Sequence, residues 1–401
     1  MFKSLSLKVI IFGFIFTFFS SFGQSFFLGL FNSSIRDALS ITQGQFGTIY
    51  ASATLLSSFL LIWVGKKIDD INIYKFAFFV TILLSFSCFF FSKISSITFL
   101  FIAIFLMRFS GQGMMSHTAT TTISRYFTKS RGRALSTSWF GLSTAEFILP
   151  VLIVYLLTVT SWQNLWIYIS ILVLIFLPIT SFTLVKNLNF ESREKTNQKE
   201  FNEKIKQWKR IEVLKDYRFY IVCLNMLAMP WIVTGVFVYQ SFISESKGWG
   251  TYVIAQSFMV YSILSVLTLL IAGFLIDRFT SRKLLIFMNI PLLISTVVLM
   301  YFDISYSAFI FLGLIGISNG LANVLGSSTW AEIYGVRYIG SIKALTTALM
   351  VFSTAFGTAL FGILIDIGLS IEQIALISFI YIALSAALLL FVKNKLNPEY
   401  L

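Results

Sequence analysis

The sequence predicts an all-α, polytopic membrane protein with twelve transmembrane helices in two pseudo-symmetric six-helix halves. The first observation is composition: of the 401 residues, 57% are hydrophobic and 12% are charged, with a mean hydropathy of +0.86. Soluble domains carry about 25% charged residues, so a soluble chain of this size could not cover its own surface. Soluble enzymes, nucleic-acid-binding domains and disordered chains are therefore excluded.

The second observation is a series of apolar runs separated by polar breaks, each near the ~20 residues that a helix needs to cross a bilayer. We expect spans at residues 9–31, 45–64, 75–92, 97–124, 134–157, 163–185, 218–240, 251–276, 283–302, 305–330, 343–366 and 371–392. The first run is longer than the apolar core of a signal peptide, and no A-x-A-like cleavage site follows it. We therefore expect it to be retained as the first span.

The third observation is the distribution of basic side chains. If the N-terminus is cytoplasmic, Arg36, Lys93 and Lys247 fall in outer segments and Arg108 falls within a span, which leaves 26 of the 30 Lys and Arg in inner segments. Cytoplasmic loops collect Lys and Arg, so the net charge of +13 indicates topology rather than a nucleic-acid partner. We expect a multi-pass protein of the cytoplasmic (inner) cell membrane with both termini in the cytoplasm.

The longest polar segment, residues 186–216, lies between spans six and seven. It divides the chain into an N-terminal half, residues 1–185, and a C-terminal half, residues 217–401. Its composition predicts a cytoplasmic linker with a surface helix around residues 205–214. A solvated linker that enforces topology is the expected role, and binding of anionic lipid is the alternative.

Short sequence repeats relate the two halves. Gly65 and Asp69 form a G-x-x-x-D pattern between spans two and three, and Gly273 and Asp277 form it again between spans eight and nine, 208 residues later. The segment RALST at residues 133–137 returns as KALTT, 210 residues later. Two matches at nearly one offset predict a duplication related by an axis along the membrane normal.

These loops resemble the motif G-x-x-x-D-[RK]-x-G-[RK]-[RK] of the major facilitator superfamily of secondary transporters. The second copy matches the motif at Gly273, Asp277, Arg278 and Arg282, with Thr280 in place of glycine. An aspartate facing a helix N-terminus is favoured by the helix dipole and can pair with a loop arginine. Such contacts can form in one state and break in another, which suits a gate.

The first copy departs further from the family pattern. It keeps Gly65 and Asp69 but has Asp70 where a base is usual and Asn72 where glycine is usual, which predicts a weaker or differently built latch. The resemblance implies transport by alternating access and assigns the motif residues of both copies to a cytoplasmic gate. A static helix cap with topology charges is the alternative.

Two fully charged residues lie mid-span, Arg108 in span four and Glu146 in span five. A charge facing lipid is costly, so each should face the protein interior. Counted from the intervening loop at a rise of about 1.5 Å per residue, they lie within about 6 Å in depth, which predicts a salt bridge. Arg108 would bind a substrate carboxylate, or hold Glu146 ionised until substrate or a proton competes. A permanent structural pair is the alternative.

Polar side chains on spans one, four and ten extend this candidate site. At 100° per residue, Gln112 is the nearest polar neighbour of the arginine in span four, whereas His117 lies on the opposite face and is expected to pack or face the cytoplasm. Gln24 ends a polar stripe on span one, and Asn319 and Asn323 share a stripe on span ten. The resemblance implies that spans one, four, seven and ten surround the cavity. For the two asparagines, helix–helix hydrogen bonding is the alternative.

These features predict a secondary active transporter of a small solute, working by symport or antiport in a proton or solute gradient. Arg108 favours an organic anion such as a monocarboxylate. The alternatives are a drug or metabolite exporter of the same fold, with Glu146 as the partner of a cation, and a transporter-like sensor that does not transport.

Absent motifs narrow the function classes further. No phosphate-binding G-x-x-x-x-G-K-[ST] motif occurs, and a single histidine with two cysteines builds no metal site. We expect no enzyme activity, no catalytic residues, no cofactor, no metal and no nucleic-acid partner. The expected partners are the small-molecule substrate, the lipid bilayer and protons, and we expect the protein to work as a monomer.

Overall fold

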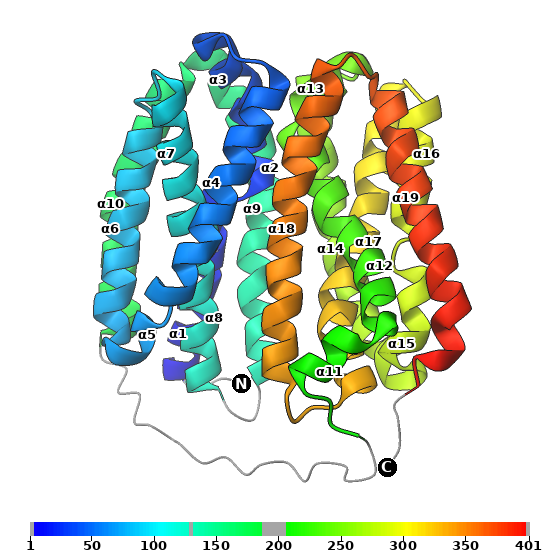
Figure 1. The fold of residues 1–401 in the computed structure, drawn as a ribbon. Coiled ribbons are helices and arrows are strands. Elements are labelled where there is room, and N and C mark those ends of the chain that lie inside the picture. The colour runs from blue at the N-terminus through cyan, green and yellow to red at the C-terminus, as the bar shows by residue number, and fades with distance from the viewer. Residues whose placement is uncertain (1–3, 128–130, 187–205, 398–401) are drawn as a thin grey trace. The chain divides into compact units, whose positions relative to one another are not determined.

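The structure is a computed structural model that describes residues 4–127, 131–186 and 206–397 (Figure 1). Within these ranges the regular secondary structure is entirely helical. Twelve helical stretches in the described part of the chain are long and apolar enough to cross a membrane. The prediction of an all-α polytopic membrane protein is therefore confirmed.

The chain forms two compact units. The first consists of Met1–Arg193 with the short segments Phe237–Phe242 and Thr358–Asp366. The second consists of Glu194–Val236, Ile243–Gly357 and Ile367–Leu401.

The first unit contains the helices of the first six spans. Their bounds are α1 (Ser4–Ser20), η1 (Ser21–Gly23), α2 (Ser25–Leu28), η2 (Gly29–Phe31), α3 (Asn32–Leu39), α4 (Gln43–Val64), α5 (Lys67–Asp70), α6 (Ile73–Phe91), α7 (Ile97–Met107), η3 (Arg108–Met115), α8 (Ser116–Tyr126), α9 (Arg131–Val159) and α10 (Trp162–Val185).

The remaining helices belong mainly to the second unit. Their bounds are α11 (Arg210–Lys215), α12 (Tyr217–Val238), α13 (Gln240–Ser246), α14 (Thr251–Phe279), α15 (Ser281–Leu284), η4 (Leu285–Phe287), α16 (Ile290–Tyr301), α17 (Ser305–Tyr334), α18 (Ile339–Asp366), α19 (Ile371–Val392) and η5 (Lys393–Lys395). The linker was expected to be solvated, but its described end packs on this unit, where Trp208 and Val213 are buried.

Hydroxyl side chains in short polar loops set where several spans begin. Thr42 accepts a hydrogen bond from the backbone of Gln45 and forms a capping box at the start of α4. Ser161 accepts a hydrogen bond from the backbone N–H of Asn164 at the start of α10, and Ser370 forms a capping box with Gln373 at the start of α19. These caps satisfy backbone N–H groups that the first turn of a helix leaves without a partner.

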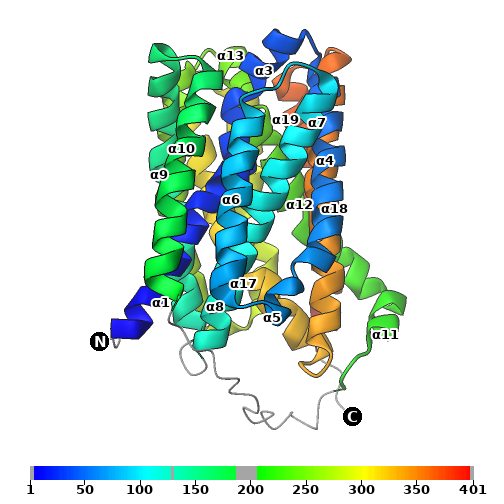
Figure 2. The same cartoon turned by 90° about the vertical axis from the view of Figure 1, so that its left-hand side faces the viewer.

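Small residues and hydroxyls hold the first unit together. A Cβ added at Gly141 of α9 would lie 2.0 Å from the carbonyl oxygen of Phe14, so only glycine lets α1 and α9 approach this closely. On the other side of the unit, Ser85 of α6 and Ser170 of α10 each donate to the carbonyl of the other at 2.9 Å. Figure 2 shows α6 and α10 side by side.

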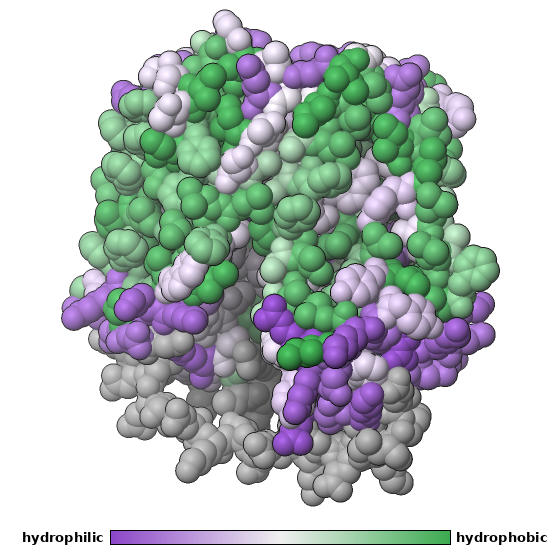
Figure 3. Space-filling model, in the orientation of Figure 1, coloured by the Kyte–Doolittle hydropathy of each residue, from purple (hydrophilic) through white to green (hydrophobic). Residues whose placement is uncertain are grey.

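The second unit relies on the same kind of packing between α14 and α17. A Cβ added at Gly316 would lie 2.4 Å from the carbonyl oxygen of Tyr261, and one at Gly320 would lie 2.5 Å from that of Ser265. Glycines spaced along α17 thus form a groove for the backbone of α14. Large hydrophobic side chains are left on the outside, and Figure 3 shows them (green) covering the long helices, with hydrophilic side chains (purple) near the helix ends.

The short segment Phe237–Phe242 is bound into the first unit by polar contacts. Asn32 donates to the carbonyl of Val238 at 2.8 Å, and the Tyr239 hydroxyl lies 3.0 Å from the carbonyl oxygen of Gln43 and 2.9 Å from that of Thr358. These bonds tie the segment to α3, to the start of α4 and to Thr358 of α18.

We predict opposite effects for two glycine-to-alanine substitutions. Gly141→Ala should lower the free energy of unfolding by about 1–3 kcal/mol, because the new methyl group overpacks the contact with α1. Gly326→Ala, in α17, meets no atom of another described segment within 4 Å and should be neutral or stabilising by up to about 1 kcal/mol, since alanine favours the helix. Thermal unfolding of the purified proteins in one detergent measures both, and equal unfolding temperatures would contradict the packing argument.

Candidate functional site

The helix of the first span is interrupted between Ser20 and Ser25, toward its C-terminal end. α1 ends at Ser20, η1 follows, and Gln24 adopts an extended conformation with φ −84° and ψ 153° before α2 begins at Ser25. The break coincides with the run SSFGQS at residues 20–25, which contains serines and a glycine that favour a helix less than alanine or leucine do. A break inside a membrane span leaves backbone groups that need partners within the protein.

Arg108 supplies such a partner. Its side chain is 2% exposed, and its Nη1 donates to the carbonyl oxygen of Gly23 at 3.0 Å and to Ser25 Oγ at 3.3 Å. The guanidinium carbon lies 5.3 Å from the centre of the Tyr50 ring, a cation–π contact. The Tyr50 hydroxyl in turn donates to Ser25 Oγ at 3.1 Å. Side chains from spans one, two and four thus meet at one point.

Two hydrogen-bond donors at this point have no acceptor among the described residues. Arg108 Nε is buried and makes no hydrogen bond there. Ser25 Oγ accepts from both Arg108 and Tyr50, which leaves its own proton for a further acceptor. A guanidinium charge and two donors without an acidic partner form an arrangement that can bind an anion.

Span four departs from α-helical geometry at Arg108. Residues Arg108–Met115 form the π-helical stretch η3, and such stretches occur frequently at functional sites. A Cβ added at Gly23 would lie 2.3 Å from the carbonyl oxygen of Met107 and 2.4 Å from the backbone nitrogen of Gln112. The broken part of span one therefore packs directly on η3. A helical phase of 100° per residue does not hold across this stretch.

The predicted salt bridge between Arg108 and Glu146 is absent from the described structure. Glu146 lies in α9 with 8% of its surface exposed and makes no hydrogen bond or ion pair with a described residue. Arg108 bonds to Gly23 and Ser25 instead. The prediction failed because residue counting fixes depth along a helix but not the direction of a side chain, and because the broken first span offers other acceptors.

The four predicted amides have different surroundings. Gln24 and Gln112 are half-buried in the first unit, at the break and in η3. Asn319, in the second unit, donates to Ser265 Oγ at 2.9 Å, which is the helix–helix bond considered as its alternative role. Asn323 is exposed, so the expectation of a buried amide was wrong for this residue.

The loop that carries Gly65 and Asp69, which we call the first motif loop, contacts a histidine of span four. Gly65 ends α4, and His117 Nε2 lies 3.0 Å from its carbonyl oxygen. Arg125, near the end of α8, donates to the carbonyl of Ile68 at 3.1 Å. His117 therefore packs against the loop, as expected, and ties span four to it. Asp69 lies in α5, and its side chain is outside the described part of the structure.

The second motif loop, which carries Asp277, Arg278 and Arg282, has different contacts from the first. Gly273 lies inside α14, which continues to Phe279. Among the described residues, no atom of another segment lies within 4 Å of a Cβ added at Gly273. Arg278 is exposed, with its guanidinium carbon 5.3 Å from the centre of the Phe279 ring. The Asp277 side chain is outside the described part of the structure.

A carboxylate from α17 caps the helix after this loop. Glu332 accepts hydrogen bonds from the backbone N–H groups of Ser281 at 2.8 Å and Arg282 at 3.2 Å. Thr280, which precedes them, has φ +71°, a region that strains a β-branched residue and suits the glycine of the family motif. In the first copy, Asn72 has φ −54° and caps α6 with its own side chain through the backbone N–H of Tyr74.

Sequence reasoning did not identify Tyr50, Ser25, Gly23 or Glu332 as site residues. The polar run at residues 20–25 was the available signal for a break in span one. No signal pointed to Tyr50 or Glu332, because each acts on a segment far away in the sequence.

Comparison with known proteins agrees with this architecture. The sequence profile of the Major Facilitator Superfamily matches residues 13–358. The chain belongs to the major facilitator superfamily. It is thus a multi-pass membrane transporter of small solutes, and the resemblance of the loop motifs to this family is confirmed. A search of curated protein sequences finds no significant match.

Two solved structures of transporters share the fold. The bacterial homologue of the human lysosomal transporter Spinster, in an inward-facing and unoccupied conformation, superposes with a TM-score of 0.74 at 12% identity, covering 100% of both chains. The nucleoside transporter NupG superposes with a TM-score of 0.72 at 13% identity, covering 98% of this chain and 99% of that one. At this identity the similarity shows the fold alone.

We predict that Thr280→Gly stabilises the protein. Glycine relieves a strained conformation that costs on the order of 1–3 kcal/mol, and it loses part of this gain to the entropy of the unfolded chain. The matched substitution in the other copy, Asn72→Gly, should destabilise slightly because it removes a helix cap from an unstrained residue. Thermal unfolding of the two variants should shift in opposite directions, and parallel shifts would argue against a strained Thr280.

Proposed function

We propose that the protein is a secondary active transporter of a small organic anion, monocarboxylate-like in chemistry, and that Arg108 contacts the anionic group. The observation that carries this proposal is a buried arginine with an unpartnered Nε and no carboxylate bonded to it among the described residues. A buried charge without a counter-charge is costly. Binding of an anionic solute would offset that cost, which gives the site its selectivity.

The geometry of Arg108 suits a carboxylate. Nη1 of the guanidinium donates hydrogen bonds to Gly23 and Ser25, and the Tyr50 ring packs against the guanidinium. The Nε–H group makes no hydrogen bond with a described residue and can donate to a bound anion. Arginine presents its donors in a planar fork that matches the two oxygens of a carboxylate. The free proton of Ser25 adds a neutral donor, and the half-buried amides of Gln24 and Gln112 lie on the same two segments.

A second contact of Arg108, with the backbone of span one, would couple substrate binding to conformational change. Its bond to the Gly23 carbonyl stabilises the break in span one. An anion that draws the guanidinium away weakens this bond, so binding and the conformation of span one are linked. We propose a proton or solute gradient as the driving force, with the buried, protonatable Glu146 of α9 as the proton-coupling residue.

The two motif loops are proposed as the gate, on the side that faces the cytoplasm if the basic residues set the orientation. The proposed gate residues are Gly65, Asp69, Gly273, Asp277, Arg278 and Arg282. Contacts such as His117 with Gly65 and Glu332 with Arg282 join helix ends through a few polar bonds. Each of these contacts lies within one unit, so breaking it would free its loop to rearrange during alternating access. The proposed location is the cytoplasmic membrane, with both termini in the cytoplasm.

The first test is counterflow uptake into proteoliposomes with labelled monocarboxylates, sugars, amino acids, a nucleoside and a cationic dye. Wild type should take up one anion. Arg108→Gln should reduce this uptake by about tenfold to hundredfold, the value of a hydrogen bond to a charged group, and Arg108→Lys should retain part of it. A binding measurement by ligand-induced thermal stabilisation separates lost binding from lost folding.

Some outcomes of this test would overturn the anion proposal while leaving transport intact. Uptake of sugar, nucleoside or dye that survives Arg108→Gln would leave Arg108 as a structural anchor for span one. Dye transport lost in Glu146→Gln would favour a cation exporter. Properly folded protein that transports nothing in the panel would favour the sensor function.

A second prediction separates coupling from binding. Glu146→Gln should retain counterflow exchange, because exchange needs no net proton movement, but should lose the acceleration that an inwardly directed proton gradient gives to wild type. The measurement compares initial uptake rates with and without the gradient. Equal acceleration in the variant and in wild type would remove Glu146 from the coupling mechanism.

A further inference from the structure

The helix that follows the linker is held firmly against the second unit. Trp208, just before α11, donates its backbone N–H to the carbonyl of Tyr334 at 3.1 Å, and the two rings lie with centroids 5.4 Å apart. Val213, in the middle of α11, is fully buried. These contacts fix which face of α11 points inward and which points outward.

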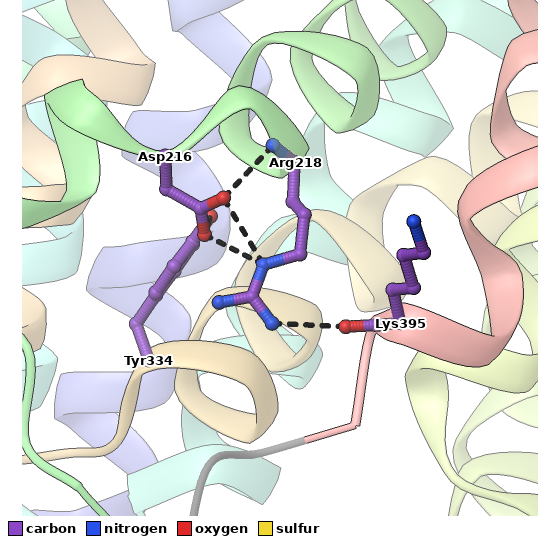
Figure 4. Close-up of polar contacts among 4 residues, drawn as sticks. All are labelled: Asp216, Arg218, Tyr334 and Lys395. Atoms are coloured by element: carbon purple, nitrogen blue, oxygen red, sulfur yellow. Dashed lines mark hydrogen bonds and ion pairs between the residues drawn. The ribbon is translucent and has the colours of Figure 1, made fainter.

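A charged clamp anchors α11 to the start of α12 (Figure 4). The Asp216 carboxylate accepts from Arg218 Nε at 2.8 Å and from the Tyr334 hydroxyl at 3.0 Å. Arg218 Nη1 donates to the carbonyl of Lys395 at 2.9 Å, so η5 joins the same clamp. The negative charge of Asp216 is paired with the positive charge of Arg218. It therefore does not neutralise the exposed lysines and arginines of α11.

The outer face of α11 combines apolar and basic side chains. Ile211 is 69% exposed and Leu214 is 37% exposed, and Lys209, Arg210 and Lys215 stand exposed beside them. We call these five residues the α11 surface. Among them lies one acidic residue, Glu212, which caps the helix by accepting from the backbone N–H of Lys209 at 2.7 Å. The surface is therefore amphipathic and net positive.

The position of the α11 surface matches the boundary of a bilayer. The span of α12 begins at Tyr217, directly after α11, and Figures 1 and 2 both show α11 beside this end of α12. Tyr217 and Tyr220 are both exposed, and tyrosines of this kind mark the interface between lipid and water. Lys395 Nζ lies 6.0 Å from the centre of the Tyr217 ring and adds a further positive charge.

We propose that the α11 surface binds the headgroups of anionic phospholipids of the surrounding bilayer, with Ile211 and Leu214 inserted at the acyl boundary. Amphipathic helices with basic polar faces bind membranes in this way, and clustered basic residues next to a membrane span attract anionic lipid. Lipid fits better than a soluble partner because Ile211 and Leu214 lie within six residues of Tyr217, where a span begins. The lipid would hold α11, and through the clamp the ends of α12, α17 and η5.

The test is binding of fluorescent phosphatidylglycerol and phosphatidylcholine to the full-length protein in an uncharged detergent. Wild type should prefer phosphatidylglycerol. Each basic residue is expected to raise the affinity for phosphatidylglycerol relative to phosphatidylcholine about fivefold. In the triple variant Lys209→Gln, Arg210→Gln, Lys215→Gln this affinity ratio should therefore fall by on the order of a hundredfold. The matched control removes three exposed lysines elsewhere, with Lys8→Gln, Lys75→Gln and Lys343→Gln, and should keep the preference.

A second measurement locates the helix in a membrane without relying on affinity. Both native cysteines are buried, so a spin label on Ile211→Cys in liposomes reports its own depth. We expect this label to be accessible to oxygen and shielded from a water-soluble nickel complex, whereas a label on Lys209→Cys should show the reverse. This contrast should be sharper in liposomes that contain phosphatidylglycerol than in phosphatidylcholine alone.

Four results would overturn the proposal. The first is equal affinity of wild type for the two lipids. The second is an equal loss in the triple variant and its control, which would indicate net charge rather than this surface. The third is a water-exposed label at Ile211→Cys. Competition by soluble glycerol phosphate at millimolar concentration would show a site for free phosphate rather than for lipid.

Discussion

The hydrogen bond from Arg108 to the carbonyl of Gly23 is the contact on which the first unit depends. Span one cannot break inside a bilayer unless another part of the protein satisfies its backbone, because no water is available there. Arg108 satisfies it at 3.0 Å, and the π-helical stretch η3 gives the arginine its place against the break. The site and the break in the helix therefore have one physical cause.

Side chains from neighbouring helices also complete the hydrogen bonding at two other helix ends. His117 meets the Gly65 carbonyl at the end of α4, and Glu332 meets the N–H groups of Ser281 and Arg282 at the start of α15. In each case a polar side chain from a neighbouring span completes the hydrogen bonding of a broken helix. Breaks held by a few polar bonds can be remade more easily than the glycine-lined contacts of α1 with α9 or α14 with α17. The protein thus contains helix pairs packed through glycines and helix ends held by a few polar bonds.

The two motif loops show how one pattern can be built in two ways. Asn72 caps its own helix, whereas Thr280 adopts a strained conformation and leaves the capping to Glu332. The clamp of Asp216, Arg218 and Tyr334 adds a further polar junction to the second unit, in a segment that composition alone describes as a solvated linker. The bond from Ser281 to Glu332 and the bond from Tyr334 to Asp216 join residues that are 51 and 118 positions apart in the chain.

The sequence by itself determined the fold class, the twelve spans and the family, and it predicted that Arg108 faces the protein interior, because hydropathy, span length and the cost of a charge facing lipid depend on local sequence. Only the tertiary structure decided what Arg108 bonds to. Residue counting placed Glu146 at a similar depth, but the direction of a side chain depends on how helices pack, and a π-helical stretch shifted the helical phase. The break at Gly23, the contact with Tyr50 and the cap by Glu332 could not be read from the sequence, since each joins segments whose proximity exists only in the folded chain.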